Sequence, residues 1–159
     1  MNFRSLLLPA LFIFSAVAAS AQQTAGLTLA QAKQLGAGAR QCAEKNGWKI
    51  SIAVVNAEGG LLYFERTDNA FSGSAEAAIE KARSASLWRR PTRVFAENVK
   101  NGRNGLPSMK SVVAIEGGVP VQLGAEHAGA IGISGAHTAE DDQCAQAAAD
   151  ALTKATQLP

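Results

Sequence analysis

The chain contains two histidines, His127 and His137, and these are the side chains best suited to chemistry. An imidazole nitrogen can bind a metal ion or transfer a proton near neutral pH. They flank a predicted strand, 127–134, in which Gly129 and Gly132 stand where strands normally avoid glycine. Strand glycines usually mark a bulge or the close approach of a ligand or another backbone. A lone surface histidine is the more common case in either position, so the surroundings decide the interpretation.

Three other kinds of site can be composed from the same region, and the sequence argues against each. The run Gly129–Gly135 lacks the G-x-G-x-x-G spacing of a dinucleotide site, and no βαβ unit surrounds it. Ser134, His137 and Asp141 could form a nucleophilic triad, but the serine is not in a G-x-S-x-G elbow. The acids Glu140–Asp142 could hold a hard cation, yet acids in a first helical turn are explained by the helix dipole.

Hydrophobic periodicity and turn residues predict the elements that position these residues. Thr28 and Gln31 form a predicted capping box at the start of the first helix, and Gly47 ends it. A β-hairpin follows, and a second one opens at Gly117-Gly118. The predicted helices are 28–45, 75–89, 92–99 and 139–156, with Ser74, Thr92 and Thr138 as the N-caps of the last three, and the predicted strands are 48–56, 61–66, 111–115, 119–123 and 127–134.

This order of elements predicts an α+β fold. An antiparallel sheet would carry the two terminal helices on one face and the middle helices on another side. The loop 100–110 contains two Asn-Gly pairs and a proline, which indicates an exposed, mobile and basic segment. The helix faces are rich in alanine and glycine, which is compatible with contacts between subunits.

Residues 1–21 have the pattern of a secretory signal peptide. Arg4 supplies the positive charge, Leu6–Ala18 is an apolar core too short to span a bilayer comfortably, and Ala19-Ser20-Ala21 is a cleavage site. We therefore expect a periplasmic or secreted protein with one mature domain, residues 22–159. The net charge of +2 and the aromatic content of 6% give no reason to expect nucleic-acid binding.

Cys42 and Cys144 lie on the apolar faces of the first and last predicted helices. An oxidising compartment permits a disulfide, and terminal helices packed on one sheet face would bring the two residues close. Two buried thiols are the alternative and the commoner situation for cysteine. A metal site is not expected, because no third ligand stands at a suitable spacing.

An ordered set of motifs covers the chain from Leu27 to Leu152. They are LTLAQAK at 27–33, KISIAVVNAEGGLLYFERTDNA at 49–70, SAEAAIEKARSA at 74–85, RRPT at 89–92, and GGVPV, GAIGISGA and EDDQCAQAAADAL within 117–152. Together they resemble the haem-degrading and haem-binding protein family. That family includes small secreted haem-binding proteins, glycolate-operon accessory proteins and the C-terminal domain of a cobalamin adenosyltransferase. The resemblance implies a profilin-like α-β-α sandwich and a homo-oligomer, often ring-shaped.

The resemblance also implies a haem site. Haem iron accepts a histidine nitrogen, its propionates seek arginine or lysine, and its ring needs an apolar slot. We expect a shallow pocket between the strand 127–135, the loop 100–110 and the end of the second helix. His137 is the expected iron ligand, because a loop before a helix adjusts more easily than a strand. The predicted haem-binding residues are His137, His127, Arg89, Arg90, Arg103, Phe95, Met109, Gly129 and Gly132.

The function implied is an exported protein that binds haem or a similar flat tetrapyrrole and supports peroxide-dependent haem degradation or iron handling. Such breakdown would need no dedicated protein acid or base, so no catalytic residue is predicted. Two alternatives stay open. One is a non-catalytic small-molecule sensor or accessory module that acts through a protein partner, such as a membrane sensor kinase. The other is an oligomeric scaffold.

Overall fold

One antiparallel sheet of four strands organises the computed structural model, which describes residues 26–157. The predicted signal peptide, residues 1–21, lies outside the described residues. Within residues 26–157, no helix is long and apolar enough to cross a membrane. The elements are α1 (Leu29–Asn46), β1 (Ser51–Asn56), β2 (Leu61–Arg66), α2 (Ser74–Trp88), α3 (Thr92–Lys100), the 3₁₀ helix η1 (Leu106–Ser108), β3 (Gly118–Leu123), β4 (Glu126–Ser134) and α4 (Thr138–Gln157).

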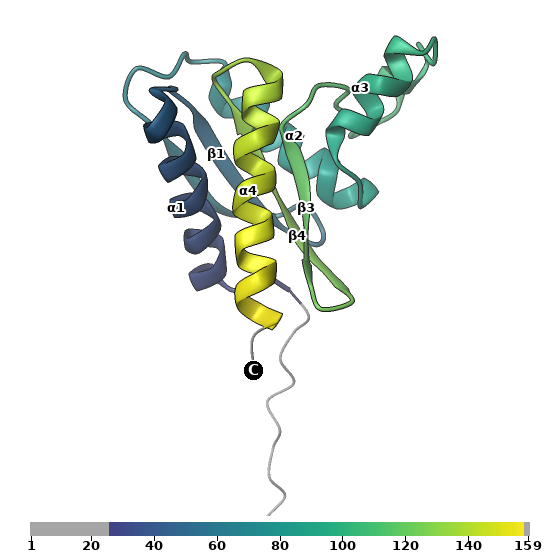
Figure 1. Ribbon diagram of the computed structural model, residues 1–159. Coiled ribbons are helices and arrows are strands. Elements are labelled where there is room, and N and C mark those ends of the chain that lie inside the picture. The colour runs from purple at the N-terminus through teal and green to yellow at the C-terminus, as the bar shows by residue number, and fades with distance from the viewer. Residues whose placement is uncertain (1–25, 158–159) are drawn as a thin grey trace, which may run out of the picture.

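The strands lie in the order β2-β1-β4-β3, so the two hairpins join through β1 and β4. Helices α1 and α4 cover one face of the sheet, and α2 covers the other (Figure 1). Larger aliphatic side chains, such as Ile52 and Ile131, fill the core under α1 and α4. The core under α2 consists mostly of alanines, including Ala53 and Ala82. This arrangement confirms the predicted α+β fold and α-β-α sandwich.

Small residues let α2 lie directly on the sheet. A Cβ added at Gly132 of β4 would stand 2.1 Å from the carbonyl oxygen of Ala78 and 2.4 Å from the nitrogen of Ala82. Any side chain there would push the helix away from the strand. The strand glycine therefore marks the close approach of another backbone, which is one of the causes that the sequence leaves open.

A disulfide joins the two helices on the other face. Cys42 of α1 and Cys144 of α4 are bonded, with their Cα atoms 5.6 Å apart. The interpretation as two separate buried thiols was therefore wrong. Both helices pack side by side on one sheet face (Figure 1), and this packing brings residues 102 positions apart into bonding distance.

Three predicted N-caps have other roles. Ser74 is the first helical residue of α2, and its hydroxyl forms hydrogen bonds with Ser51 Oγ and Phe71 O. Thr92 is inside α3, where its hydroxyl oxygen accepts the backbone N–H of Gly118 at 2.9 Å. Thr138 is the first residue of α4 and donates to Glu116. By contrast, the capping box of Thr28 at the start of α1 is present as predicted.

The predicted strand 111–115 is not a strand. The segment passes over the end of α2, where Ser84 Oγ accepts the N–H of Val113 and the indole N–H of Trp88 donates to Ser111 O. Its backbone groups thus pair with α2 instead of a neighbouring strand. Helix α3 and the loop after it project from the side of the sandwich (Figure 1).

Candidate functional site

His127 lies at the start of β4, beside the β3–β4 turn, and His137 lies between the end of β4 and the start of α4. These are opposite ends of the strand (Figure 1). Each lines a different surface hollow. The hollow at His127 also contains Arg89, at the C-terminal end of α2. The hollow at His137 lies beside the loop that joins α1 to β1. The structure therefore does not gather the predicted residues into one pocket.

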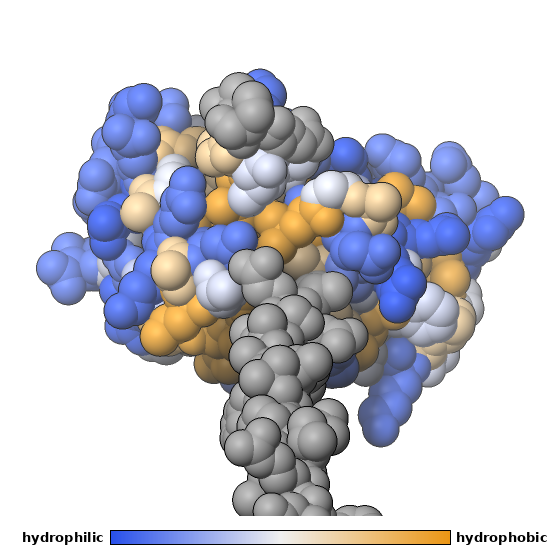
Figure 2. Space-filling model, turned by 90° about the horizontal axis from the view of Figure 1, so that it is seen from below, coloured by the Kyte–Doolittle hydropathy of each residue, from blue (hydrophilic) through white to orange (hydrophobic). Residues whose placement is uncertain are grey.

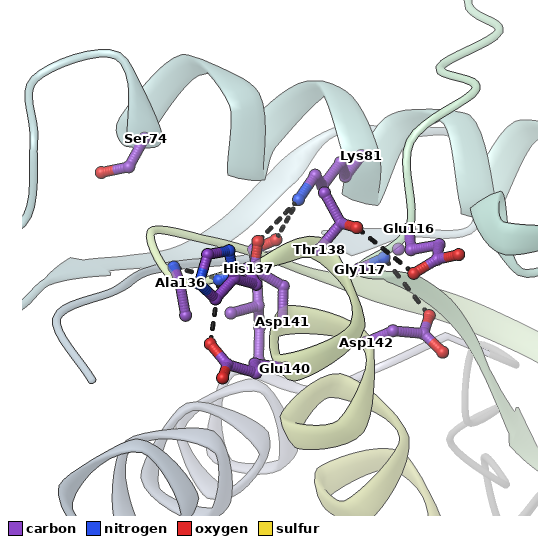
Figure 3. Close-up of polar contacts among 12 residues, drawn as sticks. Ser74, Lys81, Glu116, Gly117, Ala136, His137, Thr138, Glu140, Asp141 and Asp142 are labelled. Atoms are coloured by element: carbon purple, nitrogen blue, oxygen red, sulfur yellow. Dashed lines mark hydrogen bonds and ion pairs between the residues drawn. The ribbon is translucent and has the colours of Figure 1, made fainter. Parts of the chain in front are cut away.

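His137 occupies the position before the first residue of α4. Its carbonyl oxygen accepts the N–H groups of Glu140 and Asp141, each at 2.9 Å. Its own N–H donates to Glu140 Oε2 at 3.0 Å, which is the reciprocal half of a capping box (Figure 3). The backbone of His137 is thus fixed by the helix start. Its imidazole is exposed and makes no hydrogen bond within residues 26–157, so both ring nitrogens remain available.

The buried carboxylate of Asp141 fixes the segment before His137. Asp141 Oδ1 accepts the N–H of Ala136 at 3.0 Å, and Oδ2 accepts Lys81 Nζ at 2.9 Å (Figure 3). Lys81 also donates to the carbonyl oxygen of Ile133 at 2.9 Å. Burial raises the pKa of Asp141, while the Lys81 ammonium acts in the opposite direction. We take the pair as ionised, because the carboxylate accepts hydrogen bonds from the ammonium and from a backbone N–H.

The other acids at this helix start also have protein partners. Asp142 accepts the N–H of Gly117 through Oδ1 at 3.2 Å and pairs with Arg93 through Oδ2 at 2.9 Å. Glu116 accepts the Thr138 hydroxyl (Figure 3). Within residues 26–157, no group of three histidine, cysteine or acidic side chains could hold a metal ion. These carboxylates therefore anchor the loop before β3 to α4.

The hollow beside His137 is open and has a volume of about 500 Å³. Gly135 allows the α1–β1 loop to pack closely against the end of β4. The φ of Gly135 is 142°, and an added Cβ would stand 2.2 Å from Lys49 O. The half-buried indole of Trp48 supplies apolar surface, and the exposed Lys49 supplies a cation. The lining residues are Gly47, Trp48, Lys49, Gly135, Ala136, His137 and Glu140.

The His127 end of the sandwich has a different character. The ring of His127 is half-buried, its Nε2 contacts Ser86 Oγ at 3.1 Å, and its buried Nδ1 has no partner within residues 26–157. Burial, and then the charge of Arg89, lower the pKa of His127 below its ordinary value. A nitrogen that is either hydrogen-bonded or enclosed is poorly placed to bind haem iron, so His137 has the more accessible of the two imidazoles.

The two glycines in the predicted site do not make room for a ligand. The space beside Gly132 is filled by α2, and an added Cβ at Gly129 would stand 2.2 Å from Val55 O and 2.8 Å from Leu27. This corrects the expectation that a flat ligand lies against β4. Both glycines instead let the protein's own segments pack on the strand.

The remaining predicted residues are spread over α3 and its surroundings. Phe95 is buried and packs edge-to-face on Trp88, with ring centroids 6.2 Å apart. Arg90, Arg103 and Met109 are exposed and line neither hollow. Helix α3 projects away from the sheet, so the loop 100–110 does not border the β3–β4 turn (Figure 1).

Sequence reasoning missed Trp48 and Lys49 as neighbours of His137, and it did not place Lys81 in a buried ion pair. Lys81 is only 2% exposed. A signal was available, because Lys81 is followed by Ala82 and Ala85 on the small-residue face of α2, which is the face that meets the sheet. The nearness of Trp48 to His137 depends on how α1 and α4 pack, and no local pattern contains it.

Comparisons with known proteins agree with this architecture. The family model for "Haem degrading protein HbpS-like" matches residues 27–150. Protein GlcG of Escherichia coli (strain K12) is 41% identical over 92 residues, which are 58% of this chain and 69% of GlcG. A double mutant of Streptomyces reticuli HbpS has a TM-score of 0.75 and 32% identity, covering 91% of this chain and 99% of its own. A structure named as a PduOC:heme complex has a TM-score of 0.72 and 25% identity, covering 79% and 94% respectively.

Proposed function

This chain belongs to the HbpS-like family of haem-degrading proteins, and from that premise we propose that it binds haem with His137 as the iron ligand. The observation that carries the proposal is the imidazole of His137, which is exposed and free of hydrogen bonds within residues 26–157 while its backbone is fixed by α4. The structural relative named as a PduOC:heme complex supports haem as the bound molecule.

The residues around His137 suit a haem group. Neutral imidazole binds iron, the indole of Trp48 offers an apolar surface for the ring, and the Lys49 ammonium can meet a propionate. A volume of about 500 Å³ is within the usual range for small-molecule sites. Glu140 also lines the hollow, and its Oε2 accepts the N–H of His137. When bound, haem would supply a redox-active iron that reacts with peroxide.

In this proposal the protein's own residues fix the position of His137 and of the groups around it. The Asp141 carboxylate accepts hydrogen bonds from the backbone N–H of Ala136 and from the Lys81 ammonium. These contacts fix the residue before His137 against the start of α4. Lys49 and Trp48 approach because Gly135 lets the α1–β1 loop pack against the end of β4. We further propose that bound haem is degraded in the presence of peroxide without a protein acid or base.

We also propose export, with residues 22–159 as the mature domain. The Cys42–Cys144 disulfide supports it, because disulfides persist in oxidising compartments. Mass spectrometry of the protein isolated from the cell envelope should give an N-terminus at Gln22. A chain that retains Met1 would contradict cleavage.

A homo-oligomer is part of the proposal as well. Phe64 on the edge strand β2 is 39% exposed, and Phe71 shortly after that strand is 56% exposed. Large exposed aromatic side chains favour burial against another surface. Sedimentation of the mature protein should give a mass that is a multiple of the single chain, whereas a monomer at all concentrations would contradict this part.

Titration of the purified mature chain with haem tests the proposed binding. We expect a saturable Soret band with a defined stoichiometry, and loss of that band on addition of peroxide. Free haem in the same buffer and haem with heat-unfolded protein are the controls. If the spectrum matches free haem throughout, haem binding is refuted and a small-molecule sensor or accessory role is favoured. If the band forms but peroxide bleaches it no faster than free haem, only degradation is refuted.

A further inference from the structure

The hollow at the His127 end of the sandwich is separate from the proposed haem site. It has a volume of about 490 Å³ and lies between the β1–β2 turn, the C-terminal end of α2 and the start of β4. Figure 2 shows this end of the molecule, where apolar surface lies between hydrophilic flanks. Leu27 and Leu62 provide apolar lining, and Arg89 and His127 provide polar groups.

The contacts of Ser86 fix the tautomer of His127. The Ser86 hydroxyl has one hydrogen, and the carbonyl oxygens of Asn56 and Ala57 stand 2.8 Å and 3.2 Å from its oxygen. Carbonyl oxygens only accept, so that hydrogen is directed to them, and Ser86 Oγ must accept from Nε2–H of His127. The neutral ring therefore carries its proton on Nε2. Nδ1 is left as a buried acceptor without a donor within residues 26–157.

Arg89 brings a positive charge to this hollow. It ends α2 in the left-handed conformation, with φ 50°, and its N–H donates to Ser86 O. A non-glycine residue rarely adopts this conformation, and here it sets the direction in which Arg89 leaves the helix. Within residues 26–157 its guanidinium forms no ion pair or hydrogen bond. The acid among the lining residues, Glu58, is exposed and beyond ion-pair distance.

We propose that this hollow binds a small organic monoanion, with its carboxylate on the Arg89 guanidinium and its apolar body against Leu27 and Leu62. A planar guanidinium fork matches a carboxylate through two parallel hydrogen bonds. The leucines favour an organic body over a hydrated inorganic ion. Glu58 on the same hollow disfavours a second negative charge. The ligand class is therefore a short aliphatic monocarboxylate.

Binding of such an anion should be linked to the protonation of His127. The charged groups that act on the ring are Arg89, which disfavours its protonation, and Glu58, which favours it. An anion on Arg89 offsets the positive field, so the protonated ring becomes easier to form. By thermodynamic linkage, the same anion binds more tightly as the pH falls through the titration of His127.

NMR titration of the mature protein with butyrate tests the proposal. The ring Cε1–H resonance of His127, assigned by its loss in His127→Gln, should shift saturably, and its pKa should rise when butyrate is bound. Arg89→Gln should weaken butyrate binding by roughly tenfold or more, since a charge-assisted bidentate contact is lost. Arg90→Gln changes the same charge at the next position, outside the hollow, and should leave binding unchanged.

A second ligand and a second variant define the site more narrowly. Inorganic phosphate should bind more weakly than butyrate, and tighter phosphate binding would overturn the monocarboxylate class. His137→Ala should leave butyrate binding unchanged, so failure of the haem proposal would not affect this result. Absence of a saturable shift, or an equal shift in Arg89→Gln, would refute the site. Competition between haem and butyrate would show that a haem propionate is the carboxylate, and would overturn the separate small ligand.

Discussion

Lys81 Nζ in α2 lies 2.9 Å from Asp141 Oδ2 in α4, and this ion pair links helices on opposite faces of the sheet. The side chains are 3% and 2% exposed. Lys81 reaches the pair at the end of β4, where it also binds Ile133 O. Gly117 passes directly over it, and an added Cβ there would stand 2.9 Å from Lys81 Nζ. The three layers of the sandwich are therefore joined by polar contacts at one end.

Removing one partner of this pair should be costly. Lys81→Met leaves the Asp141 carboxylate buried without its cation, so we expect the free energy of unfolding to fall by about 3–5 kcal/mol. The double variant Lys81→Met with Asp141→Asn removes both charges and keeps an acceptor for Ala136, and it should recover most of the loss. Urea denaturation measures both. Arg83→Gln, which breaks an exposed pair with Glu80, is the matched control and should cost less than about 1 kcal/mol. Strictly additive losses in the double variant would contradict coupling.

The disulfide should be a main source of stability. It closes a loop between residues 102 positions apart, which in the chain-entropy model is worth about 4–5 kcal/mol. We expect Cys42→Ser with Cys144→Ser to lower the free energy of unfolding by that order. The wild-type protein in reducing buffer should show the same loss. Thiol labelling of the unreduced, denatured mature protein should detect no free thiol, and detection of two would contradict the bond.

Gly132 should not tolerate a side chain. An added methyl group meets Ala78 O and Ala82 N of α2, so Gly132→Ala should lower the free energy of unfolding by about 2–3 kcal/mol or more. Gly105 is the matched control, because an added Cβ there has no atom within 4 Å. Gly105→Ala should change stability by less than about 0.5 kcal/mol. Thermal and urea unfolding of both variants check the difference, and equal stabilities would show that α2 is not held tightly on the strand.

His127 should make stability depend on pH in a defined direction. Its pKa in the folded protein lies below the ordinary value of 6.5, so below that pH the unfolded chain binds more protons than the folded one. The stabilisation is complete above pH 6.5 and is lost as the pH falls toward the folded pKa. Urea denaturation across this range should show a decline that His127→Gln reduces and the control His137→Gln retains. A decline of the same size in His127→Gln would assign the effect to other groups.

Much of the fold could be predicted because local patterns and packing agree. The Thr28 capping box, the left-handed Gly47 at the end of α1 and the bounds of β2 are as predicted. The prediction of a strand at 111–115 was wrong. An apolar run alone does not show whether its backbone pairs with a strand or with a helix side chain, as the N–H of Val113 does here. The prediction of Thr92 and Thr138 as N-caps was wrong, because their hydroxyls form hydrogen bonds with segments distant in sequence.

The candidate site was predicted less well, for a related reason. His137 was identified from its type and its place before a helix, which are local properties. The neighbours Trp48 and Lys49 come from a loop that is far away in sequence and is brought there by Gly135. Arg103 and Met109 were expected nearby, but they follow α3, which leads that part of the chain away from the sheet. Long-range packing, which has no periodic signal, decided both outcomes.

The absorption spectrum of haem bound to single histidine variants tests the central claim most directly. In His137→Ala, haem should bind more weakly and the Soret band should shift, because the iron loses its imidazole ligand. In His127→Ala, the spectrum and the affinity should stay as in the wild-type protein, since that ring has one nitrogen bonded to Ser86 and the other enclosed. Unchanged spectra in His137→Ala, or a shifted spectrum only in His127→Ala, would contradict ligation by His137.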